Sequence, residues 1–358
     1  AKEEDQDEAC YRQFYEEALS LCRQKRFHEA LEKCRYTSLD DEEEYSIDVI
    51  QPEKIEFKQN SYEDGENSII SFPEFLLLVL DVCTGGEQPA SHYQPDKLIE
   101  KFDALKTYFT AGEFYEKMLY YRLLLDYYTI RRDIKDGQGN YSLILKGPKD
   151  DSDKLKQYQS MLYVSTEAFY NWLKPYLRKL EQDELHSCAE MLAFLKEGDN
   201  ERHSILPARK DLSYKASGNI RYWFWRLDYY LWEQRSTFFN EEEQKIVEHY
   251  VFRRNRSIEH LHPQDESHNE EWEEEAVHSF GNLAMISQSF NSQQSNDHIQ
   301  IKFARIHEQI SNKSLQSIKM FLMCKLADFN YLNWTMKLNK EHENEMIEFL
   351  ERSFYISD

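Results

Sequence analysis

Glycine and proline are scarce in this chain, and their scarcity constrains its fold more than any other feature. Of 358 residues, only 10 are glycine and 8 are proline. These are the two residues least tolerated in helix interiors, whereas the frequent Glu, Leu, Lys and Gln are good helix formers. We therefore expect a mainly α-helical fold. The length of the chain is enough for two or three domains, and a hydrophobic content of 41% indicates that most of it folds.

The spacing of apolar residues predicts where the helices lie. Tyr11, Phe14 and Ala18 recur at three- and four-residue steps, which places them on one helical face. The segment Ser71 to Glu74 reads Ser-Phe-Pro-Glu, which is typical of a helix start. Helices are expected over 5–37, 71–83, 97–108, 112–133, 153–198 and 218–250, with the fifth divided near Pro175.

The segment 218–250 is rich in aromatic residues, and two interpretations of it are open. Its aromatic side chains include Tyr222, Trp223, Trp225, Tyr229, Tyr230 and Trp232. Interleaved with Arg221 and Arg226, they could stack on nucleic-acid bases. Such a stripe more often belongs to a core, with the arginines extending their charged ends to solvent. We favour the core interpretation.

The net charge of −22 argues against a general nucleic-acid binder, which should be basic. The charge is uneven, however. Residues 1–67 hold 20 acidic and 9 basic residues, whereas residues 276–319 carry two acidic and four basic ones. A locally positive groove is therefore possible in the C-terminal part of an acidic protein.

The six cysteines form no Cys-x-x-Cys pair, so a zinc knuckle is not expected. We expect buried or half-buried thiols in a reducing cytosol. The longest apolar run, Phe75 to Leu80, is too short to cross a membrane. The sequence opens on Ala1 without Met or a secretory signal, which suggests a fragment or processed product of a cytoplasmic protein.

The sequence pattern changes after Arg256. Residues 257–263 alternate like a short strand that ends at Pro263, and an acidic polar loop follows as far as Glu275. Residues 280–286 are expected to form a second short strand. A polar turn starts at Asn291, and helical spacing returns over 297–310. This order of strand, loop, strand and helix is the context that a ββα-metal nuclease centre requires.

Four residues in this segment have side chains suited to phosphodiester cleavage. A neutral imidazole such as that of His260 can take a proton from water. The carboxylate of Glu259 and the amide oxygen of Asn291 could together hold a hard cation such as Mg²⁺. Neighbouring strand residues point to opposite faces, so Glu259 and His260 need a bend to converge on one phosphate. The Asn282 side chain can bond backbone groups and hold the loop that presents His260.

The runs Ser257-Ile-Glu-His-Leu-His-Pro-Gln264, Gly281-Asn-Leu283 and Asn291-Ser292 resemble the HNH domain at the C-terminal end of GmrSD-type modification-dependent restriction enzymes. These are bacterial phage-defence proteins that act on DNA. The resemblance implies His260 as general base, Glu259 and Asn291 as ligands of Mg²⁺ or Mn²⁺, and Asn282 as the residue that orders the loop. With Asn291 in the last position, the motif has a His-Asn-Asn form. The resemblance is specific over about 50 residues and loose elsewhere.

Six further residues are candidates for contacts with phosphate or substrate. His262 shares a face with His260 if the strand continues, and His278 lies near the second strand. Arginine grips phosphate well, but a charged helix end explains the arginines before the motif equally well. The six candidates are His262, Arg254, Arg256, His278, Asn296 and Lys302.

The family's other half, an N-terminal ParB-like nucleotide-hydrolysing domain, has no counterpart in this sequence. We expect it in a longer protein or in a separate subunit. Within the chain, we expect a helical region over 1–200 and a helical domain over 201–358, with the ββα-metal unit at about 253–312. Two functions follow: a metal-dependent DNA endonuclease or nickase, or a non-catalytic interaction module with a decayed HNH centre.

Overall fold

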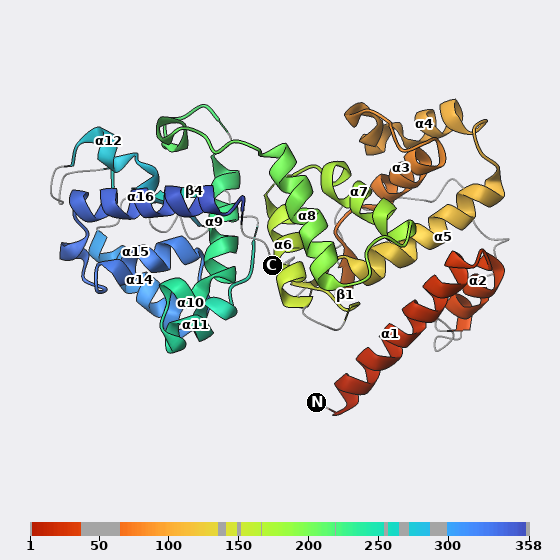
Figure 1. Ribbon diagram of the computed structural model, residues 1–358, viewed down its shortest axis with the longest axis horizontal. Helices are drawn as coiled ribbons and strands as arrows, with labels where there is room; N and C mark the ends of the chain where they lie inside the picture. Colours follow the sequence, from red (N-terminus) through yellow and green to blue (C-terminus); the bar gives the residue numbers. More distant parts are fainter. Residues whose placement is uncertain are drawn as a thin grey trace, which may run out of the picture. The chain divides into compact units, whose positions relative to one another are not determined.

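The fold is mainly helical, as the composition predicted, in a computed structural model of the chain (Figure 1). The structure describes residues 2–36, 65–134, 141–148, 152–165, 167–218, 220–253, 257–264, 272–286 and 299–355. Its residues divide into two compact units. Unit 1 comprises residues 1–152 and 168–191, and unit 2 comprises residues 153–167 and 192–358. Unit 2 is thus built from two separate segments of the chain.

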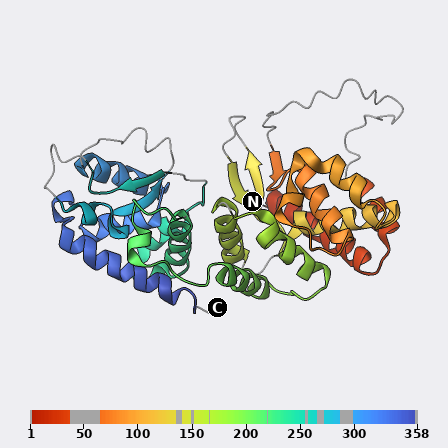
Figure 2. The same ribbon diagram turned by 90° about the horizontal axis from the view of Figure 1, so that it is seen from above.

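Unit 1 packs helices beside a small sheet. Its helices are α1 (Lys2–Arg23), α2 (Phe27–Tyr36), α3 (Phe72–Cys83), α4 (Leu98–Leu105), α5 (Ala111–Tyr128) and α7 (Phe169–Glu181). Its strands are β1 (Gly65–Ser68), β2 (Arg131–Ile134) and β3 (Tyr141–Ile144). All pairs are antiparallel, in the order β1-β2-β3, and Figure 2 shows β2 and β3 side by side.

The start of α3 is where the sequence predicted it. The Ser71 hydroxyl accepts a hydrogen bond from the Glu74 amide, and the Glu74 carboxylate accepts one from the Ser71 amide at 2.7 Å. This reciprocal capping box satisfies two amides that a helix end would otherwise leave unpaired.

Several helix predictions were wrong in detail. The helix expected over 218–250 divides into three, α9 (Arg221–Glu233), α10 (Arg235–Phe238) and α11 (Glu241–Glu248). The helix expected over 5–37 is interrupted after Arg23, where Lys25 adopts a positive φ of 60°. The helix expected over 112–133 ends at Tyr128, because Thr129 is extended and the chain enters β2. Pro175 lies inside α7, whose C-terminal end is instead marked by Asp183 at a φ of 57°.

Unit 2 contains most of α6 (Ser152–Val164) and α8 (Cys188–Arg202). Its other helices are α9 (Arg221–Glu233), α10 (Arg235–Phe238), α11 (Glu241–Glu248), α12 (Glu274–Val277), α14 (Ile299–Ser311), α15 (Ile318–Leu326) and α16 (Met336–Arg352). Strands β4 (Ser257–His260) and β5 (Leu283–Ile286) form an antiparallel pair, joined to the short 3₁₀ helix η6 (Phe280–Asn282).

Helix α9 is core, as preferred above, since every residue from Tyr222 to Trp232 is buried. Arg226 does not extend to solvent, however. It is fully buried, and its guanidinium donates to the carboxylate of Asp199 at 3.2 Å. The hydroxyls of Tyr158 and Tyr222 each donate to the same carboxylate at 2.7 Å. Because a buried ion pair is tolerated only when its remaining polar atoms are bonded, these tyrosines are part of what keeps Asp199 charged.

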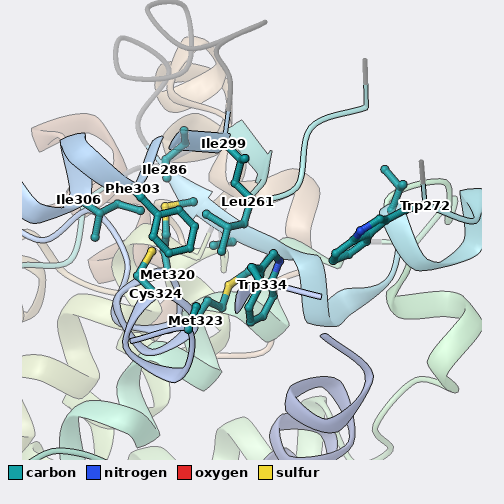
Figure 3. Packing of buried hydrophobic residues seen from close by; sticks show 13 residues of the cluster. Leu261, Trp272, Ile286, Ile299, Phe303, Ile306, Met320, Met323, Cys324 and Trp334 are labelled. Atoms are coloured by element: carbon teal, nitrogen blue, oxygen red, sulfur yellow. The ribbon is translucent and has the colours of Figure 1, made fainter. Parts of the chain in front are cut away.

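A second cluster of buried residues surrounds the β4–β5 pair. Figure 3 shows it, with Leu261, Phe303 and Trp334 near its middle. Helix α14 contributes Ile299, Phe303 and Ile306 through one face, as its three- and four-residue spacing requires. The remaining members are Trp272, Val277, Ala284, Ile286, Met320, Met323, Cys324 and Ala327.

The cysteine prediction holds for five of the six thiols; Cys10 is exposed. All six are free. None of the helices that the structure describes is long and apolar enough to cross a bilayer.

Candidate active site

The β4–β5 pair positions the two residues at the centre of the motif. Glu259 lies opposite Ala284, and His260 lies opposite Leu283. All four residues of β5 are buried, so both faces of this small sheet are covered. Glu259 and His260 point to opposite faces, and their surroundings differ accordingly.

Asn282 connects the second half of the motif to the first. Its side-chain oxygen accepts a hydrogen bond from the His262 amide at 2.8 Å, and its side-chain nitrogen donates to the His262 carbonyl at 2.9 Å. The same nitrogen donates to the Val277 carbonyl at 2.8 Å, and the Trp334 indole donates to the oxygen at 3.2 Å. Asn282 is fully buried, and these bonds fix the segment just after His260.

His262 is buried in the structure, with 3% of its surface exposed. Its ring stacks on Trp272 at 4.0 Å between centroids and 4° between planes. Trp272 itself is buried, although it belongs to the acidic segment that was expected to form a polar loop. The reason is the large apolar surface of the Trp272 indole, which favours burial even between glutamates.

His260 lies in a cluster of rings on its own face of the sheet. Its Nε2 is 3.1 Å from Nδ1 of His278, and its ring meets Tyr214 at 4.6 Å between centroids. The Gln264 amide nitrogen is 3.0 Å from Nδ1 of His260. Burial, with smaller contributions from the nearby His278 and Lys302, lowers the pKa of His260 to about 3. The ring is therefore neutral at pH 7 and carries the lone pair that a base needs.

His278 is half-buried and held from its backbone. Its carbonyl accepts hydrogen bonds from the Tyr214 amide and the Ser213 hydroxyl, both at 3.0 Å. Its ring stacks on Tyr214 at 5.7 Å. Partial burial and Lys215 lower the pKa of His278. Nothing in the sequence pointed to Tyr214, which lies outside the motif. Gln264 belongs to the run that carries the resemblance, but no role was assigned to it from the sequence.

Glu259 is bound to the ammonium of Lys302 on α14. The Glu259 and Lys302 side chains are 8% and 4% exposed, so the ion pair is buried. The Lys302 ammonium also donates to the His260 carbonyl at 2.7 Å. Lys302 thus binds both residues of the motif at once, from a helix more than forty positions along the chain.

These contacts test whether the site fits the expected divalent cation. A hard cation such as Mg²⁺ needs several oxygen ligands. In the described part of the chain, no group of three or more His, Cys, Asp or Glu side chains could hold a metal ion. Glu259, the carboxylate expected to bind it, already carries an ammonium that would repel a second cation. With Lys302 in this position, the described residues do not fit the metal.

Lys319 binds the backbone on both sides of Asn282. Its ammonium donates to the carbonyls of Phe280, Gly281 and Leu283 at 2.9, 3.2 and 2.7 Å. Burial lowers the pKa of Lys319 to about 7, against the opposing effect of Asp228 and Glu343. These three carbonyls flank Asn282, so Lys319 fixes the backbone that carries the Asn282 side chain.

The other motif residues that the sequence singled out lie outside the described residues. They are Asn291, Arg254, Arg256 and Asn296. The structure therefore brings together Glu259 with Lys302, His260 with His278, and Asn282 with His262. The relation of these three pairs to Asn291 stays a prediction.

One family model matches this part of the chain. Residues 205–349 match the family described as GmrSD restriction endonucleases, C-terminal domain. The match includes Glu259, His260, Asn282 and Lys302, and it lies wholly within unit 2. No curated protein and no solved structure matches the chain. Residues 205–349 are therefore a C-terminal domain of the GmrSD restriction endonuclease family, which is an HNH-type nuclease domain.

Proposed function

We propose that this domain is a metal-dependent endonuclease or nickase that cleaves DNA phosphodiester bonds. It would be the effector half of a bacterial restriction or phage-defence protein, acting with a ParB-like nucleotide-hydrolysing domain or subunit. The observation that carries the proposal is the pair of hydrogen bonds between Asn282 and His262. They hold the segment after His260 in one geometry, which is what a base must have to act on a bound water.

His260 is the general base in this proposal. Its neutral ring takes a proton from water while the water oxygen bonds to phosphorus and the bond to the leaving oxygen breaks. A pKa of about 3 makes the ring a weak base in the free protein. An approaching phosphate is negative and would favour the protonated ring, so substrate binding itself would strengthen the base.

The proposed cation is Mg²⁺, with Mn²⁺ as a substitute and Glu259 and Asn291 as its ligands. Its contribution would be to neutralise charge on the phosphate. Glu259 can bind it only if Lys302 releases the carboxylate, since the two are paired in the structure.

The test is incubation of the full chain with supercoiled plasmid in MgCl₂ or MnCl₂ at low salt. Low salt matters because binding to phosphates weakens steeply with ionic strength and this chain carries a net charge of −22. Plasmids with unmodified and with modified bases should be compared. Relaxed or linear product that disappears with EDTA supports the proposal. An intact plasmid under every condition contradicts it for the isolated chain and favours the non-catalytic module.

A further inference from the structure

We infer that His278 is a positioning residue for His260: it accepts a hydrogen bond from Nε2 of that ring and leaves Nδ1 as the nitrogen that carries the lone pair. The inference rests on the proposed function, in which His260 is the general base. It gives His278 a role inside the site, whereas the sequence suggested a contact with phosphate or substrate.

The first argument is the contact between the two rings. Nε2 of His260 lies 3.1 Å from Nδ1 of His278, which is a hydrogen-bonding distance. The His260 ring is buried, with 5% of its surface exposed, and His278 is half-buried. Two lone pairs or two N–H groups facing each other at this distance would repel. One proton therefore lies between the two nitrogens.

The second argument decides which ring carries that proton. The Gln264 amide nitrogen, which can only donate, lies 3.0 Å from Nδ1 and 3.1 Å from Nε2 of His260. If His278 donated to Nε2, it would occupy the one lone pair of the neutral His260 ring, and Gln264 would face an N–H group at Nδ1. If His260 donates from Nε2, the lone pair on Nδ1 accepts from Gln264 and every group has a partner. The proton therefore belongs to Nε2 of His260.

The third argument is that His278 is itself fixed. Its carbonyl accepts hydrogen bonds from the Tyr214 amide and the Ser213 hydroxyl, both at 3.0 Å. Its own amide donates to the Glu274 carbonyl at 3.1 Å. Its ring lies nearly parallel to the Tyr214 ring, with 14° between the planes. A histidine held through both its backbone and its ring can in turn hold the ring of His260 in one orientation.

This arrangement determines which nitrogen of His260 can act as the base. Nε2 carries the proton and faces the His278 ring, so it has no lone pair to offer. Nδ1 has the lone pair, and its partner Gln264 is an exposed residue whose amide a water molecule can replace. His278 thus selects the nitrogen that takes the proton and the side from which the water must approach.

The first experiment records NMR spectra of the full chain with ¹⁵N-labelled histidine in EDTA, without DNA, at about pH 8, where imidazole is neutral. The His260 signals are those that are missing from His260→Ala. We expect a ring proton on Nε2 of His260 that correlates through the hydrogen bond with Nδ1 of His278. Nδ1 of His260 should have the chemical shift of an unprotonated nitrogen. A proton on Nδ1 of His260, or equal amounts of the two tautomers, would overturn the inference.

Two variants of His278 test its role in the reaction. His278→Leu removes the acceptor, so the Nε2 proton of His260 should exchange with water too fast to be observed. His278→Asn supplies an amide oxygen as acceptor and should retain the proton signal. In plasmid nicking, His278→Leu should lower kcat by about 10²-fold and leave KM within about twofold of the native value, because a misplaced base slows the reaction without weakening binding.

His278→Asn should recover most of the lost kcat. A rise in KM at unchanged kcat in His278→Leu would mean that His278 contacts the substrate, and it would overturn the positioning role. If circular dichroism shows that His278→Leu is unfolded, the spectrum of the native chain and the kcat of His278→Asn decide the question.

His203→Leu is the matched control. His203 is another half-buried histidine of unit 2, and its ring stacks on Tyr222 at 3.6 Å between centroids and 12° between planes. Its replacement should change neither the proton signal of His260 nor kcat. Loss of the signal in both variants would make it a general effect of lost stability and overturn the inference.

Failure of this inference is distinguishable from failure of the proposed function. The NMR signals do not depend on cleavage, so their absence from a chain that nicks plasmid would overturn the role of His278 and leave the nuclease. Their presence in a chain that nicks no plasmid would contradict the proposed function and leave the hydrogen bond between the two rings.

Discussion

Asn282 and His262 share two hydrogen bonds, one in each direction: the Asn282 amide oxygen accepts from the His262 N–H, and its amide nitrogen donates to the His262 C=O. The two residues are twenty positions apart. The Asn282 side chain supplies the backbone hydrogen bonds that a longer β4 would have made with a neighbouring strand. Because β4 ends at His260, Asn282 completes the hydrogen bonding of the chain beyond the strand. The segment that follows His260, the proposed general base, is thereby joined to the second half of the motif.

Asn282→Asp should destabilise unit 2 although it keeps the side-chain shape. The substitution removes the donor to the carbonyls of His262 and Val277 and buries a carboxylate beside them. We expect a loss of about 2 kcal/mol or more in the free energy of unfolding. Denaturant titration followed by tryptophan fluorescence measures it, since five of the six tryptophans lie in unit 2. Asn312→Asp, at an exposed position, should change stability by less than about 0.5 kcal/mol; an equal loss in both variants would refute the explanation.

Gly281→Ala should also be costly, because α16 approaches this glycine closely. An added Cβ would lie 2.6 Å from the Asn339 carbonyl oxygen and 2.8 Å from Cβ of Glu343. The backbone of α16 or of η6 would have to shift, at about 1–3 kcal/mol of unfolding free energy. Gly218→Ala is the control, since nothing lies within 4 Å of its added Cβ. Equal urea midpoints for the two variants would show that the contact with α16 is not tight.

His342→Leu should stabilise the protein, most strongly in acid. His342 is buried, and neither ring nitrogen has a hydrogen-bond partner among the described residues. Burial lowers its pKa well below the ordinary value of 6.5, and Lys319 adds to the effect. Between these pKa values the unfolded chain binds a proton that the folded one does not, so stability falls as the pH drops below about 6.5.

His342→Leu removes this loss of stability in acid, because leucine binds no proton. Its gain over the native chain should therefore be about 2 kcal/mol larger at pH 5 than at pH 8. Thermal and urea unfolding at the two pH values measure the difference. His307→Leu, at an exposed position on α14, should show no such pH dependence. A gain for His342→Leu that is the same at both pH values would mean that the buried ring is not neutral.

The sequence was informative where the cause of structure is local. The cap at Ser71, the helical spacing expected over 297–310 and the start of the short strand at Ser257 each depend on a few adjacent residues. That strand ends at His260 and not at Pro263 as expected. The boundaries that were wrong depend on single backbone conformations, such as the positive φ of Lys25, which no side-chain pattern signals. The polar strand Arg131–Ile134 lacks the alternation that marks a half-buried strand.

The same distinction between local and long-range causes applies to the residues of the candidate site. Glu259, His260 and Asn282 were found because the chemistry requires those side chains at nearby positions. The ion pair between Glu259 and Lys302 and the contact between His260 and Tyr214 join residues over forty positions apart. Both contacts form because α14 and the segment before α9 pack against the site. The spacing of residues along the chain does not predict packing between segments that are far apart in sequence. Likewise, the acidic composition of the chain does not indicate that Lys302 and Lys319 are both buried in the candidate site.

The most direct test of the account compares the plasmid-nicking rate of the native chain with that of His260→Ala in MnCl₂ at low salt. His307→Ala, an exposed histidine on α14, is the matched control. Loss of a general base should reduce the rate by about 10²–10⁴-fold in His260→Ala, with no reduction in His307→Ala. Far-UV circular dichroism should show the same helical content in all three proteins. Cleavage by His260→Ala at the native rate would contradict the assignment of His260 and, with it, the nuclease centre proposed for this domain.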